Sequence, residues 1–128
     1  MIIKLAKDSE TGRNYEAGKP PTPELIAAMV RLQEQMAPSG ALLSNGELFP
    51  DGRGARLKAA GGRIIITDGP FTESKEVIGG YAILRANSKE EAIRMGEDWM
   101  NLHVDVLGAA FEAEMEIREM MELPCPRG

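Results

Sequence analysis

The side chains of this sequence that could carry chemistry are concentrated in one charged stretch, residues 68–76. Asp68, Glu73, Lys75 and Glu76 follow directly after the apolar run 64–66. A carboxylate held in a partly apolar cleft can have a raised pKa and act as a general acid or base. We therefore interpret Asp68 as a candidate catalytic base, Glu76 as a candidate proton relay, and Glu73 as a candidate substrate contact.

The first part of this stretch also has a purely structural interpretation. Asp68 can accept hydrogen bonds from backbone N–H groups about two residues further on, as in an Asx turn. Gly69 tolerates conformations that other residues resist, and Pro70 pushes it toward an extended backbone. Phe71 can anchor such a turn to the core. Both interpretations of Asp68 remain open at the level of the sequence.

His103 is the single histidine, and histidine is the side chain whose ordinary pKa lies near neutrality. It serves either as a structural hydrogen-bonding group or as a second catalytic group beside Asp68. The remaining candidate substrate contacts are Lys75 or Arg118, as the anchor of an anionic substrate, with Tyr81, Tyr15 and Arg13 around it.

Composition excludes several classes of function. The 128 residues carry 15 basic and 20 acidic side chains, so no clustered basic surface for nucleic acid is expected. One His and one Cys exclude a His/Cys-rich metal site, and we expect neither a metal nor a cofactor. There is no apolar run of the roughly 20 residues that a membrane span needs, and no signal region. With a lone cysteine, Cys125, these features predict a cytoplasmic protein without a membrane partner.

The first half of the sequence predicts a strand, a loop, a helix and a second strand. Alternating apolar residues indicate a strand over 2–7, followed by a polar loop over 8–21 that is either a solvated excursion or a lid. Thr22 as N-cap and Pro23 behind it begin a helix that ends at Pro38-Ser39-Gly40. A strand over 41–49 follows, interrupted by a turn or bulge at Asn45-Gly46.

The second half predicts a hairpin, a strand, a helix and a last strand. The hairpin has its turn at Gly61-Gly62, and a strand over 77–86 follows the charged stretch. Ser88 and Glu91 form a capping box that begins the second helix. Residues 101–108 are predicted as a loop or an irregular last turn, and strict alternation over 111–118 favours a strand.

This order of elements predicts a single domain over residues 1–128, with an α+β ferredoxin-like plait and an inserted β-hairpin. Both faces of the strands around residues 64–66 and 81–84 are apolar, whereas two helices cover only one face of a sheet. The second face needs another layer. We therefore predict a homodimer with two-fold symmetry.

The charged stretch also resembles a known family. Asp68-Gly69-Pro70-Phe71-Thr72-Glu73-Ser74-Lys75-Glu76, followed by Gly79-Gly80, is similar to the signature of the DGPF-type branch of the YCII-related proteins. Similar segments extend along the chain, at residues 7–10, 16–18, 21–25, 40–43, 88–93 and 114–118. The resemblance implies a dimeric ferredoxin-like fold, of the dimeric α/β-barrel type.

The resemblance implies less about activity. The wider superfamily is similar in fold to small lactone isomerases and related ring-processing enzymes, and a His–Asp pair is its proposed active site. Asp68 matches the acidic half of that pair. The His of the YCII branch lies in the first helical region, and residues 22–37 contain none, so His103 is either a replacement or irrelevant. Proteins of the DGPF type are often encoded beside, or fused to, alternative sigma factors, which suggests a regulatory link.

These observations predict a small organic ligand in a cleft at the sheet edge or the dimer interface. If the protein is an enzyme, we expect cofactor-independent isomerisation or elimination next to a carbonyl. The alternative is a non-catalytic metabolite-sensing or regulatory module linked to transcription, and a purely structural dimer is a third possibility. A pocket whose wall both Asp68 and His103 reach would favour catalysis.

Overall fold

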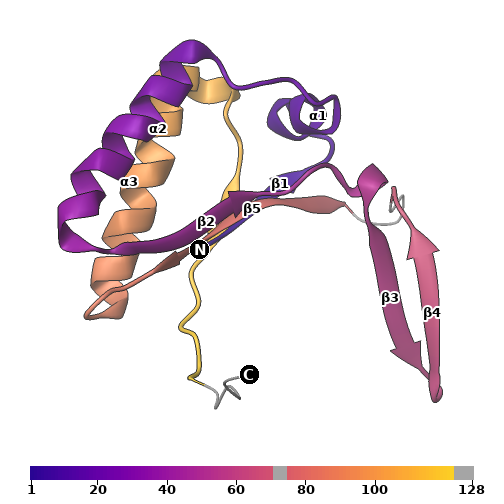
Figure 1. Cartoon of the computed structure of the whole chain (residues 1–128). Coiled ribbons are helices and arrows are strands. Elements are labelled where there is room, and N and C mark those ends of the chain that lie inside the picture. Colours follow the sequence, from indigo (N-terminus) through magenta and orange to yellow (C-terminus); the bar gives the residue numbers. More distant parts are fainter. Residues whose placement is uncertain (71–74, 123–128) are drawn as a thin grey trace.

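The computed structural model describes residues 1–70 and 75–122, apart from the side chain of residue 51. Within these ranges the chain forms strands and helices in mixed order (Figure 1). The strands are β1 (Ile2–Ala6), β2 (Leu42–Glu47), β3 (Ala55–Ala60), β4 (Arg63–Asp68), β5 (Glu76–Leu84) and β6 (Glu114–Glu116). The α-helices are α1 (Glu10–Glu16), α2 (Pro23–Met36) and α3 (Lys89–Leu107), with short 3-10 turns at Ala37–Ser39, Asp51–Arg53 and Gly108–Ala110.

The main sheet has four strands in the order β2-β5-β1-β6, and every neighbouring pair is antiparallel. Helices α2 and α3 lie on the same face of it (Figure 1). This mixed α+β arrangement is consistent with the predicted ferredoxin-like fold. None of the helices in the described ranges is long and apolar enough to cross a bilayer.

The two long helices begin where the sequence predicts. Thr22 caps α2 by accepting a hydrogen bond from the backbone N–H of Leu25 at 3.2 Å. Ser88 caps α3 by accepting from the N–H of Glu91 at 3.1 Å. The Glu91 carboxylate accepts in return from the N–H of Asn87 at 2.9 Å, one residue earlier than in the usual capping box. Both helix starts are therefore set by short-range side-chain chemistry.

The prediction of a loop over residues 8–21 is wrong for its central part, which forms α1. Ser9 accepts a hydrogen bond from the N–H of Gly12 at 2.9 Å and donates one to the carbonyl of Ala6 at 2.7 Å. A side chain at Gly12 would place its Cβ 1.9 Å from that same carbonyl oxygen. Glycine is a poor helix former, but here it permits the close approach of α1 to the end of β1.

Two predictions for the C-terminal half also need correction. The second helix does not loosen at residue 101 but continues to Leu107, because Trp99, His103 and Leu107 extend its inward stripe at helical spacing. The predicted strand over 111–118 is reduced to β6, which pairs only with residues 2–4 of β1. In β2, Asn45 and Gly46 stay within the strand, so no turn interrupts it.

The hydrophobic core is small and lies where β1 and β5 meet. Ile3, Leu5 and Val77 are buried there, and Tyr15 and Trp99 pack against them. The remaining space between α2 and the sheet is not filled by side chains. It forms the pocket described below.

Strands β3 and β4 form a separate two-stranded antiparallel sheet around Gly61 and Gly62, both at positive φ. In Figure 1 this hairpin extends past one end of the main sheet, on the side away from α2 and α3. No described helix covers that side of the main sheet. The hairpin and the uncovered face are therefore exposed together.

Candidate functional site

A pocket of about 730 Å³ lies between α2, α3, α1 and the inner face of the main sheet. This volume is typical of sites for small organic molecules. Its wall is largely apolar. The apolar side chains include Ile3, Leu5, Leu25, Met29, Leu32, Met36, Trp99 and Phe111.

His103 is the most deeply buried titratable residue in this wall. Only 5% of the residue is exposed. Its ring contacts two aromatic rings, with centroid distances of 3.8 Å to Trp99 and 5.0 Å to Phe111. Its Nδ1 lies 2.8 Å from the carbonyl oxygen of Trp99, one helical turn earlier. The imidazole is therefore fixed in position by stacking and by a hydrogen bond.

The hydrogen bond to Trp99 also determines the tautomer. A carbonyl oxygen only accepts, so Nδ1 must carry the proton and donate it. Burial lowers the pKa of His103, while the Trp99 carbonyl and the charge of Glu47 oppose that shift more weakly. The neutral ring then has an unprotonated Nε2, which can accept a hydrogen bond or a proton.

Glu47, at the end of β2, is an acidic residue in the same wall that sequence reasoning missed. It pairs with Gly80 of β5, which brings it to the inner face of the sheet. The sequence gives little indication that Glu47 lines a pocket, because a single glutamate at the end of a strand is usually solvated. Other polar residues in the wall are Glu10, Asn14, Lys19, Gln33 and Asn45.

The glycine pair in β5 allows backbones to pack closely at the pocket wall. A Cβ at Gly80 would lie 2.9 Å from the carbonyl oxygen of Gly46. Where β1 pairs with β5, Ile3 lies opposite Gly80 and Lys4 lies opposite Ile78, so Gly79 is an extra, bulged residue. A Cβ at Gly79 would lie 3.3 Å from the Leu5 side chain. Glycines within a strand permit such a close approach, and the structure shows β2 and Leu5 making it.

Helix α1 closes one end of the pocket and is tied to both sides of it. The Tyr15 hydroxyl donates to the carbonyl of Leu48, just after β2. Thr11 donates to the carbonyl of Ala110 at 3.2 Å and accepts from the N–H of Glu112 at 2.9 Å. These contacts attach α1 both to the end of β2 and to the segment between α3 and β6.

Three of the nine sequence-predicted site residues lie in this wall, namely Tyr15, Tyr81 and His103. The pocket does not include Asp68, which is exposed at the end of β4. The structure therefore does not bring Asp68 and His103 together in one wall. Arg13 is exposed on α1 and donates to the carbonyl of Asp8. Glu73, and the predicted anchor Phe71, lie outside the described residues.

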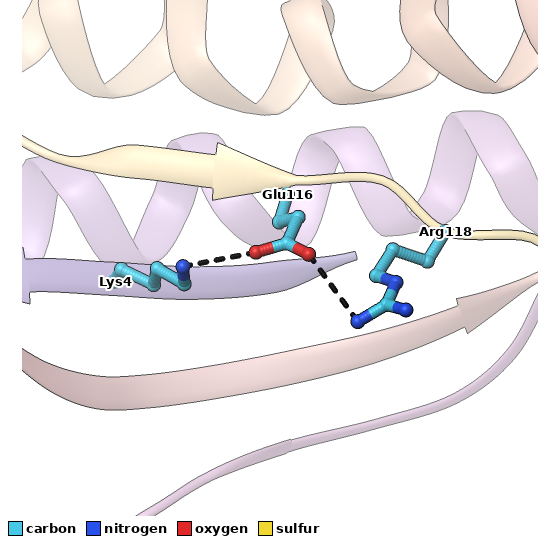
Figure 2. A network of polar contacts seen from close by, with 3 residues as sticks. All are labelled: Lys4, Glu116 and Arg118. Carbon is cyan, nitrogen blue, oxygen red and sulfur yellow. Dashed lines mark ion pairs between the residues drawn. The ribbon is translucent and has the colours of Figure 1, made fainter.

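The other three predicted residues lie away from the pocket. Lys75 and Glu76 are exposed at the start of β5. Figure 2 shows Arg118 beside Glu116, at 3.5 Å, with Lys4 on the other oxygen of that carboxylate at 2.9 Å. These ion pairs are solvent-exposed and contribute little stability. No group of three or more His, Cys, Asp or Glu in the described ranges is arranged to hold a metal ion.

Comparisons with known proteins place this geometry in a family. Residues 2–103 match the family model of the YCII-related domain. Among curated proteins, an uncharacterised protein of Rhizobium meliloti (strain 1021) is 31% identical over 70 residues. That match covers 55% of this chain and 56% of the Rhizobium protein, so it spans little more than half of either.

Proposed function

The chain belongs to the YCII-related family, and we propose that it binds a small organic molecule in the pocket around His103. The observation that supports this most directly is a buried histidine in the wall of a largely apolar cavity. A fully packed core would have filled this space with side chains. This proposed site lies between the helices and the main sheet, whereas the sequence predicted a cleft at the sheet edge or dimer interface.

The lining residues favour a compact ligand with an apolar body and one or two polar groups. The walls from α2 and α3 offer aliphatic and aromatic contacts, through Leu25, Met29 and Trp99 among others. His103 offers one hydrogen-bond acceptor at Nε2, and Glu47 supplies a second polar contact. A ligand that donates a hydrogen bond from an enol or phenol O–H, or that has an acidic C–H next to a carbonyl from which a base can take the proton, matches this set.

His103 is also suited to proton transfer without a cofactor. A neutral imidazole with a lowered pKa is a base that is available at neutral pH. Its Nδ1–H bond to Trp99 holds the ring and stabilises positive charge on it when Nε2 takes a proton. We infer isomerisation or elimination next to a carbonyl as the chemistry, with His103 in the role that the sequence assigned to Asp68.

The alternative function, a metabolite-sensing module that does no chemistry, would use the same pocket. Recovery of the bound molecule unchanged would support this alternative. The DGPF-type branch, with its regulatory link, is inferred from the signature at residues 68–76 alone. The two functions therefore differ in the fate of the ligand rather than in the place where it binds.

A thermal-shift screen with small carbonyl and phenolic compounds tests the site. We expect compounds that raise the melting temperature of the wild type and not of His103→Phe, which keeps an aromatic ring but has no Nε2. Asp68→Asn is the matched control, since Asp68 lies outside the pocket. A compound whose effect depends on Asp68 and not on His103 would refute this site. NMR of the recovered compound in D₂O then detects proton exchange or conversion.

A further inference from the structure

The two ends of the pocket differ in chemistry, and the strand pairing shows how far apart they are. In β5, Gly80 lies opposite Glu47 of β2. Leu84, four residues further along β5, lies opposite Leu42 at the start of β2. At the rise of a β-strand these two positions are about 13 Å apart, and all four residues line the pocket. The pocket is therefore long enough for an extended molecule.

The end of the pocket at Leu84 is largely apolar and contains methionine. Met36, at the end of α2, and Met95 of α3 both line the wall. They lie toward this end, because α2 leads into β2 at Leu42 and α3 follows β5 after Leu84. Methionine side chains are unbranched and adapt to flexible apolar groups. This end therefore suits the alkyl part of a ligand.

The end of the pocket at Glu47 presents hydrogen-bond acceptors. Glu47 lies on the inner face of the sheet, because Gly80 opposite it also pairs with the core residue Ile3. Its charge acts on His103 and opposes the lowering of that pKa. The Nε2 of His103 is a second acceptor, since Nδ1 is already hydrogen-bonded. No basic side chain in the described part of the chain forms an ion pair with Glu47, so its carboxylate is open to a ligand.

This end of the pocket favours positive charge on the ligand. Trp99 and Phe111 contact the ring of His103 there, and the faces of aromatic rings attract cations. Among the described residues of the wall, two carboxylates and one ammonium group carry charge, those of Glu10, Glu47 and Lys19. An anionic ligand is therefore disfavoured, and a cationic one is attracted.

We propose that the ligand is an amphiphilic amine, with its ammonium group bound to Glu47 beside His103 and an alkyl chain that extends along the pocket toward Met36. A primary ammonium has three N–H donors and no acceptor, which matches an end that offers acceptors. The Nε2 of His103 stays available for the acidic C–H or O–H of the proposed chemistry. The inference rests on the proposed site around His103 and adds the class of its ligand, with Glu47 as the specificity-determining residue.

Calorimetric titration with three compounds of equal chain length tests the role of Glu47. The compounds are octylamine, 1-octanol and octanoate, and octylamine should bind the wild type most tightly. Glu47→Gln keeps the shape of the side chain without its charge, so it should weaken octylamine binding about tenfold and leave octanol binding unchanged. The control Glu34→Gln removes a charge from an exposed position of α2 outside the pocket and should change neither affinity.

The alkyl part of the ligand has a test that needs no variant. From propylamine to octylamine, the dissociation constant should fall about fourfold for each methylene that enters the pocket. A dissociation constant that does not depend on chain length, or octylamine binding that Glu47→Gln leaves unchanged, would overturn the proposal. If octanol or octanoate binds in a way that His103→Phe abolishes and octylamine does not bind, the site stands and the amine class is wrong. If none of the three binds, both the site and the amine class are wrong.

Discussion

His103 and Trp99 are joined twice within one helical turn of α3. The Nδ1 of His103 lies 2.8 Å from the Trp99 carbonyl oxygen, and the centroids of the two rings are 3.8 Å apart. The backbone bond sets the tautomer and the stacking sets the orientation of the ring. One turn of α3 thereby holds a buried imidazole in the wall of an apolar pocket.

This arrangement predicts different effects for two substitutions of His103. His103→Ala should lower the free energy of unfolding by about 2–4 kcal/mol, because it removes a large buried ring and leaves a cavity. His103→Phe keeps a ring of similar volume against Trp99 and Phe111, so its loss should stay below about 1.5 kcal/mol. Urea unfolding monitored by circular dichroism measures both. Equal losses in the two variants would contradict the packing role of the ring.

The stability of the wild type should depend on pH through His103. Burial lowers the pKa of His103 in the folded state, so below about pH 6.5 the unfolded chain binds more protons at this site. The free energy of unfolding therefore falls as pH drops below about 6.5, by at most about 1.4 kcal/mol per pH unit from this group. Above that range the contribution is constant. The difference in the free energy of unfolding between the wild type and His103→Phe, measured from pH 8 to pH 5, isolates the contribution of His103.

Gly12, which is buried, should be far less tolerant of alanine than an exposed glycine. In Gly12→Ala the new Cβ would lie 1.9 Å from the Ala6 carbonyl oxygen, so α1 must move away from β1. We expect a loss of about 2–4 kcal/mol, typical of overpacking and lost local contacts. Gly52→Ala is the matched control, since nothing lies within 4 Å of its Cβ position, and it should change stability by less than about 0.5 kcal/mol. Thermal unfolding of the two variants compares them directly.

The start of α3 should depend on Ser88. Ser88→Ala removes the acceptor for the Glu91 N–H and should cost about 1 kcal/mol. Ser44→Ala, at an exposed position of β2, provides the control for loss of a serine hydroxyl elsewhere. Similar melting temperatures for the two variants would show that the cap is dispensable.

Local chemistry allowed much of the fold to be predicted from the sequence. The caps at Thr22 and Ser88 and the turn at Gly61-Gly62 act over a few residues, and the structure shows all three. Helix α1 was not predicted because the contact that explains its glycine is visible only in the folded structure. Only contact with Ala6 explains a glycine at position 12 of a seven-residue helix.

The candidate site was less predictable, because a pocket is made by packing between distant segments. The sequence drew attention to Asp68 through its charged neighbours, yet the hairpin holds Asp68 away from the pocket. His103 was identified because it is the single histidine, but its neighbours Trp99 and Phe111 come together only where α3 meets the segment before β6. Glu47 required the pairing of β2 with β5.

The β3–β4 hairpin has a final consequence for the behaviour of the isolated chain. Each of its strands pairs with one other strand among the described residues, so β4 has an open edge along the isoleucine run 64–66. An apolar, β-branched edge of this kind is a template for cross-β growth into fibrils. Lys58 and Arg63 place charge beside that run, where stacking of identical chains would bring like charges together. The same two side chains therefore oppose open-ended stacking of the chain along this edge.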